Sequence, residues 1–162
     1  MSLHREKLKD AIVYVSSHSG VRDLGLTKLF KLLYFADSAH LREYGESITG
    51  SDYIKYEHGP VPSRGEKCVR QLRKDERLRV EKVPYAGVEM MSISAVGAPS
   101  WSALADEEVA TLDVICSQLG RETAAMLSKK SHTEPAWVAA QMLQKLSDEL
   151  MLYGAVEDPD GL

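Results

Sequence analysis

The stretch LTKLFKLLYFADSAHLREY, residues 26–44, decides the fold of this chain. Its apolar side chains, from Leu29 to Ala36, cover most of the circumference of a helix, and Thr27 can cap the start of that helix. A helix that is apolar nearly all round is surrounded by protein and not by water. We therefore predict a helix from Thr27 to about Tyr44 at the centre of the fold.

Further helices are predicted on both sides of this central helix. Recurring apolar residues place helices at residues 4–18, 109–119 and 135–153, and shorter helices are expected at 64–76 and 122–130. Ser63 and Glu66 form a capping-box pattern at the start of the helix at 64–76. Pro135 suits the first turn of the last helix, because that position needs no N–H donor.

Three short segments have the alternating pattern of strands, at residues 52–57, 77–83 and 88–94. The first is expected to stop at residues 58–62, because Pro60 and Pro62 have no N–H to donate to a sheet. The other two are joined by a turn and predict a hairpin, which the first could join. The predicted fold class is α+β, predominantly helical, with about six helices around a central apolar helix and a small antiparallel sheet of two to three strands.

Length and composition are those of an ordinary globular domain. The chain has 162 residues, of which 44% are hydrophobic and 27% charged. We predict a single domain over residues 1–154 and an acidic tail over 155–162. No apolar run or signal peptide points to a membrane or to secretion, so a cytoplasmic location is expected. Cys68 and Cys116 lie far apart in sequence on apolar helix faces, which predicts two buried thiols and not a metal cluster.

Three pieces of sequence together resemble the Panacea domain of SocA-like antitoxins, a bacterial and phage family also described as phage-associated proteins. They are residues 26–45, the segment 53–61 that ends in His-Gly-Pro-Val, and residues 127–137. In order and spacing they cover residues 8–137. The residues that carry the resemblance are Lys28, Lys31, Leu33, Tyr34, Asp37, His40, Tyr44, Gly45, His58, Gly59, Pro60, His132, Pro135 and Trp137.

The resemblance implies a small helical domain that acts as the antitoxin of a toxin–antitoxin system. Such a protein contacts its cognate toxin directly, and some members are thought to deliver the toxin to a protease. It would be a protein-binding module and not an enzyme, with no cofactor. Because the family is paired with toxins of unrelated kinds, the chemistry of the toxin does not follow from the resemblance.

A metal-dependent hydrolase or nuclease is the alternative from another class. Asp37, His40, His58 and His132 are suitable ligand types, but only the first two are close in sequence, and a closed site needs three or four converging groups. We favour a structural role, in which Asp37 and His40 hydrogen-bond to neighbouring segments and His132 bonds to the turn at 58–61. An unpaired partner would then cost about 1 to 3 kcal/mol.

A basic stripe, defined as Arg64, Lys67, Arg70 and Lys74, recurs at helical spacing. Charged stripes usually face water, but this one could guide an acidic partner, with Tyr85 and Trp101 as aromatic anchors. A DNA-binding regulator that uses residues 64–82 is a further alternative. Acidic residues interrupt this segment, so nucleic acid is the weaker expectation. The net charges of residues 1–63, 64–105 and 106–162 are 0, +3 and −7, a polarity that suits protein binding.

Overall fold

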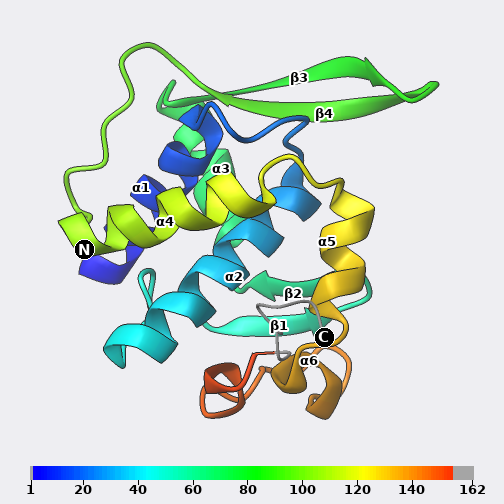
Figure 1. The fold of residues 1–162 in the computed structure, drawn as a ribbon. Helices are drawn as coiled ribbons and strands as arrows, with labels where there is room; N and C mark the ends of the chain where they lie inside the picture. Colours follow the sequence, from blue (N-terminus) through cyan, green and yellow to red (C-terminus); the bar gives the residue numbers. More distant parts are fainter. Residues whose placement is uncertain (1, 155–162) are drawn as a thin grey trace.

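The structure is a computed structural model that describes residues 2–154. Its central element is α2 (Leu26–Tyr44), which runs between two β-hairpins and is covered by the other helices (Figure 1). Leu29, Leu32 and Tyr34 have no exposed surface, which confirms the predicted central helix. The predicted cap at Thr27 is wrong. The N-cap is Gly25, and Thr27 lies inside the first turn, because the extended backbone of Gly25 lets its carbonyl accept from Leu29 N.

Four other predicted helices are confirmed, with shifted ends: α1 (Leu3–Ser17), α3 (Gly65–Lys74), α4 (Asp106–Leu119) and α5 (Ala124–Ser131). The capping box at Ser63 and Glu66 is wrong, since α3 starts after Arg64 without a side-chain cap. Ser63 is used elsewhere: its N–H donates to the Asp52 carbonyl at 2.8 Å and extends the neighbouring hairpin.

The strands form two separate antiparallel pairs and not one three-stranded sheet. β3 (Leu78–Tyr85) pairs with β4 (Val88–Ala95), as predicted, whereas β1 (Tyr53–Tyr56) pairs with β2 (Gly59–Pro62). We expected the chain to leave the sheet at Pro60 and Pro62. They fit because they stand opposite Lys55 and Tyr53, at the positions of the antiparallel ladder that exchange no hydrogen bonds.

The predicted C-terminal helix at 135–153 is wrong beyond its first turns. α6 (Pro135–Ala139) is short, and the chain then lies along the outer edge of β1 before a 3-10 turn, η1 (Leu150–Leu152). Leu143 N donates to Lys55 O at 2.8 Å, Lys55 N to Gln144 O at 2.9 Å, and Leu146 N to Tyr53 O at 2.8 Å. These bonds satisfy backbone groups of β1 that a helix would leave without partners.

Two further expectations concern the thiols and the tail. Cys68 and Cys116 are both buried and unbonded, as predicted, and burial raises the pKa of the Cys116 thiol to about 12. The acidic tail at 155–162 lies outside the described residues. Within residues 2–154, no helix has both the length and the apolar composition needed to cross a bilayer.

Candidate functional site

The fold brings the three family-like sequence pieces together at one place. α2 contacts both β2 and α5, and α5 contacts β2. We call this meeting of α2, the β1–β2 hairpin and residues 127–137 the motif joint. Several of its polar side chains, among them Lys31, Asp37 and Ser131, are buried, so the question is whether they form a reactive site or hold the segments together.

Asp37 lies at the bottom of the motif joint and has no exposed surface. Its Oδ1 accepts hydrogen bonds from Ile48 N at 2.8 Å and Thr49 N at 2.9 Å, and its Oδ2 accepts from the Thr49 and Tyr53 hydroxyls, both at 2.6 Å. Burial raises the pKa of Asp37, while these hydrogen bonds lower it in part. All four donors belong to the chain that leads from α2 into β1, so the carboxyl fixes that connection.

Lys31 is the second buried ionisable side chain of the motif joint, with 1% of its surface exposed. Its Nζ donates to the Pro60 carbonyl at 2.8 Å, and burial lowers its pKa to about 8. Gly59 makes this approach possible. Its φ is 115°, and a Cβ there would overlap Lys31 Cε and Ser131 Oγ. The Ser128 hydroxyl holds the same turn from α5 by donating to the His58 carbonyl at 2.7 Å.

Lys28 and Tyr34 extend this row along α2. Lys28 is buried and its Nζ donates to the Arg22 carbonyl, before α2 begins, and burial lowers its pKa. The ring of Tyr34 packs edge-on against Tyr53, with centroids 5.2 Å apart. Burial and then the Glu134 carboxylate raise the pKa of Tyr34. Glu134 itself lies 3.7 Å from the Arg42 guanidinium.

The end of α2 carries the remaining motif residues of this helix. His40 Nδ1 lies 2.9 Å from the Thr111 hydroxyl on α4, and its ring packs against Tyr44. Gly45 ends α2 in the left-handed conformation, with a φ of 79°. Leu33 is part of the core. Asp37 and His40 therefore bond to neighbouring segments, which is the structural role that the sequence favoured.

The histidines of the hairpin and of the last motif piece lie elsewhere. His58 is exposed at the turn between β1 and β2. His132 is stacked on Trp137, with ring centroids 4.2 Å apart, and its buried Nε2 has no hydrogen-bond partner. The expected bond from His132 to the turn is therefore wrong, and the turn is held instead by Ser128, whose hydroxyl donates to the His58 carbonyl. Trp137 donates instead to Tyr56 O at 3.2 Å, and the Lys55 ammonium lies 4.0 Å from its ring centroid.

These positions bear on the metal-dependent alternative. In residues 2–154, no group of three or more His, Cys, Asp or Glu side chains is arranged to hold a metal ion. Asp37, His40, His58 and His132 do not converge: the first faces the loop before β1, the second α4, the third water and the fourth Trp137. The motif joint is a set of structural hydrogen bonds and not a ligand cluster.

The basic stripe is exposed along α3, whose buried side chains are Cys68, Val69 and Leu72. Arg70 makes a long ion pair with Glu66, at 3.8 Å, and both side chains are more than half exposed. Of the two expected aromatic anchors, Tyr85 is partly exposed at the end of β3. Trp101 packs edge-on against Tyr14 of α1, at 4.8 Å, and belongs partly to the core.

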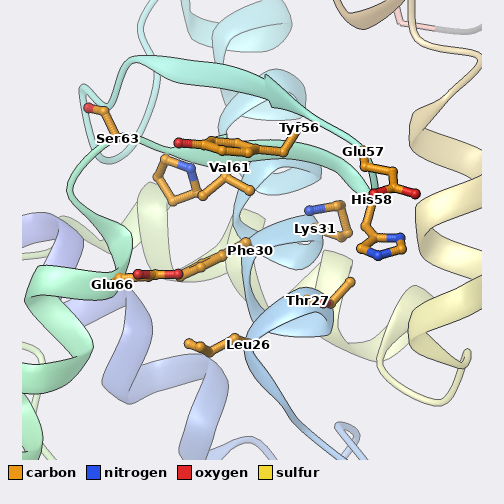
Figure 2. Close-up of a pocket in the computed structure, with 11 residues that line it drawn as sticks. Leu26, Thr27, Phe30, Lys31, Tyr56, Glu57, His58, Val61, Ser63 and Glu66 are labelled. Atoms are coloured by element: carbon orange, nitrogen blue, oxygen red, sulfur yellow. The ribbon is translucent and has the colours of Figure 1, made fainter. Parts of the chain in front are cut away.

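Beside the motif joint, the surface is hollowed. A cavity of about 490 Å³ lies between α2, the β1–β2 hairpin and α3, and Figure 2 shows the side chains around it. A second hollow of about 270 Å³ continues between α3 and the β3–β4 hairpin, and Leu26 and Glu66 line both. The sequence did not indicate these hollows, because their walls come from four segments whose packing no local pattern reveals.

Other partners in the motif joint were also missed. Thr49, Ser128 and Ser131 supply hydroxyls to Asp37, the His58 carbonyl and the Ser128 carbonyl respectively. For Thr49 a weak signal existed, since it lies in a short polar loop directly before a strand whose alternation buries Tyr53. Ser128 and Ser131 lie three residues apart on one helix face, a spacing that is equally common on solvated faces.

The comparisons with known proteins agree with the sequence resemblance. The family model described as antitoxin SocA-like, Panacea domain, matches residues 29–138. This span includes most of α2, the whole β1–β2 hairpin, and α5 with Trp137 of α6. No curated protein and no solved structure matches the chain significantly.

Proposed function

This chain belongs to the Panacea-domain family of SocA-like antitoxins, and on that premise we propose that it neutralises a cognate toxin by binding it directly. We treat residues 1–154 as one binding domain that acts in the cytoplasm. Membership of this family suggests a non-enzymatic role.

One observation about the motif joint carries the proposal. Its buried carboxyl, Asp37, accepts hydrogen bonds from four donors inside the fold, and the buried Lys28 ammonium donates to a backbone carbonyl. A catalytic centre would instead leave such groups open toward a substrate. Hollows and charged side chains lie next to the joint, on a surface that a protein partner can reach.

Co-expression tests this function. The reading frame beside this gene is induced alone and together with the chain, and growth and complex formation are measured. We expect growth arrest by the neighbouring product alone, rescue by the chain, and a stoichiometric complex on size-exclusion chromatography. Rescue without a complex would contradict neutralisation by direct contact.

Delivery of the toxin to a cytosolic protease is the finer form of this proposal. It is tested by the half-life of the toxin after translation is blocked. Masking alone leaves the half-life unchanged or longer in the presence of the chain. Delivery shortens it, and deletion of the host's ATP-dependent proteases restores it.

A further inference from the structure

We propose that the cavity beside the motif joint receives an acidic side chain of the toxin, with the Lys31 ammonium as its ionic partner. The inference rests on the proposed function and names the surface and the chemistry of the partner. It starts from an ammonium group that has fewer partners inside the protein than its chemistry demands.

Lys31 carries three N–H donors when it is protonated. Among the described residues its Nζ has one acceptor, the Pro60 carbonyl, and no carboxylate pairs with it. A buried charge in such a place is normally paired, because burial without a counter-ion is costly. The position of the ammonium is fixed, since its stem is packed against Gly59 and its tip is bonded to Pro60.

The cavity gives this ammonium a neighbouring space. Lys31 lines it together with Thr27 and Phe30 of α2, while Val61 and Pro62 of β2 form an apolar wall. Figure 2 shows Thr27 and Lys31 on successive turns of α2, on the side that faces the hairpin. A carboxylate that entered this space would form a charge-assisted pair with the Lys31 ammonium, and because Lys31 itself is almost fully buried, such a pair is stronger than one in water.

The residues that line the adjoining hollow indicate which side chains of the partner lie next to that carboxylate. This hollow is lined by the apolar side chains of Leu26, Val69, Val80, Met91 and Ile93, and by Arg70 and Arg73. Glu66, which lines both hollows, is exposed and lies close to Arg70. The complement of this surface is a segment with apolar side chains and flanking carboxylates. We therefore assign both hollows to one acidic, amphipathic segment of the toxin.

The test uses the full chain and the product of the neighbouring reading frame, with affinity measured by calorimetry. Lys31→Met keeps the length of the side chain and removes its charge. Thr27→Asp places a carboxylate one turn before Lys31, inside the cavity, at a helix start where an acid is favourable. Both variants should weaken toxin binding by at least about thirtyfold, the loss typical of a buried charge partner.

Matched controls separate this effect from damage to the fold. Lys28→Met removes a second buried lysine of α2 that lies outside this cavity. It should bind within about threefold of the parent. Thr27→Asp should melt at or above the parent's temperature, because it supplies the counter-ion that Lys31 lacks.

Each other outcome overturns the inference. If Lys31→Met and Thr27→Asp bind the toxin like the parent, the cavity is not the docking site, while the antitoxin function stands. If the parent does not bind the toxin, the proposed function falls and this inference falls with it. If the parent instead forms a salt-sensitive dimer that Thr27→Asp abolishes, the occupant is a second copy of the chain and not the toxin.

Discussion

Five polar residues of α2 recur every three positions: Lys28, Lys31, Tyr34, Asp37 and His40. Because a helix turns by about 100° per residue, each step of three moves the side chain about 60° around the axis. The row therefore winds around α2 and reaches a different neighbour at each step: the loop before α2, the hairpin, Glu134, the loop before β1, and α4. Through these five side chains, α2 fixes the positions of the segments around it.

Replacing Asp37 should lower the free energy of unfolding more than replacing His40. Asp37→Ala leaves two buried N–H groups and two hydroxyls without their acceptor, so the free energy of unfolding should fall by about 3 kcal/mol or more. His40→Ala removes a single hydrogen bond and should cost about 1 to 2 kcal/mol. Urea unfolding at pH 7 measures both, and equal losses would contradict the ranking.

Substitution by alanine should destabilise the protein far more at Gly59 than at Gly45. Both have positive φ, but a Cβ at Gly59 overlaps Lys31 and Ser131, whereas a Cβ at Gly45 meets nothing within 4 Å. Gly59→Ala should therefore destabilise by about 3 kcal/mol or more, and Gly45→Ala by about 1 kcal/mol. Thermal unfolding of the two variants decides; a Gly59→Ala protein as stable as Gly45→Ala would mean that Lys31 does not pass beneath Gly59.

Burial of Lys31 predicts a stability that rises in mild alkali. The pKa of Lys31 falls from its ordinary value of 10.5 to about 8, so between these values the unfolded chain binds more protons than the folded one. Stability linked to Lys31 then increases as the pH rises from 8 to 10.5, by up to about 3 kcal/mol. The difference in unfolding free energy between the parent and Lys31→Met, measured across this range, isolates the effect. A difference that does not change with pH would refute it.

At the scale of elements, the spacing of apolar residues predicted the helices that bury a continuous apolar surface of their own. The periodicity of residues 4–18 and 26–44 was sufficient for α1 and α2, because both bury a continuous apolar surface. The segment after α6 has the same kind of periodicity at Leu143, Leu146 and Leu150. There the unpaired edge of β1 offers hydrogen bonds that outweigh helix propensity, and no pattern inside 140–150 reveals that edge.

This difference between a helix and an edge segment can be tested with two leucines. Leu146 is 1% exposed and packs in the core, whereas Leu143 is 62% exposed. Leu146→Ala should lower the free energy of unfolding by about 2 to 4 kcal/mol, and Leu143→Ala by less than about 0.5 kcal/mol. Chemical denaturation gives both values. If both substitutions lowered the free energy of unfolding equally, both side chains would be packed, and the segment would be a buried helix and not an edge segment.

At the scale of the whole molecule, charge is separated along the chain. Residues 64–105 have a net charge of +3 and residues 106–162 of −7. The basic stripe lies on α3, in the positive part of the chain, and its Arg70 also lines the proposed docking surface. Such a field accelerates the approach of an oppositely charged partner without adding much to the lifetime of the complex.

Neutralising the basic stripe should therefore change the association rate and not the dissociation rate. With Arg64, Lys67, Arg70 and Lys74 replaced by Gln, association with the toxin should slow and lose most of its salt dependence. Dissociation should stay nearly unchanged, since each exposed pair contributes at most about 1 kcal/mol. Stopped-flow kinetics at two salt concentrations measures both rates. A faster dissociation would show that these residues anchor the partner.

The site was less predictable from sequence than the fold. Asp37, His58 and His132 were candidates by residue type, but their directions depend on how α5 and the hairpin pack against α2. Even Lys31 was recognised only as part of a resemblance. Its importance follows from burial and from the single acceptor at Pro60, which are properties of the packed molecule and not of residues 26–44.

The pairing of residues 143–146 with β1 also has a consequence during synthesis. β1 leaves the ribosome about 90 residues before the segment that covers its outer edge. At roughly 5 to 20 residues per second, that edge is open for roughly 5 to 18 seconds in every nascent chain. During this interval it can pair with a strand of a neighbouring nascent chain. Dense translation of one messenger therefore exposes this protein to co-aggregation, and chaperone capture of the emerging hairpin would protect it.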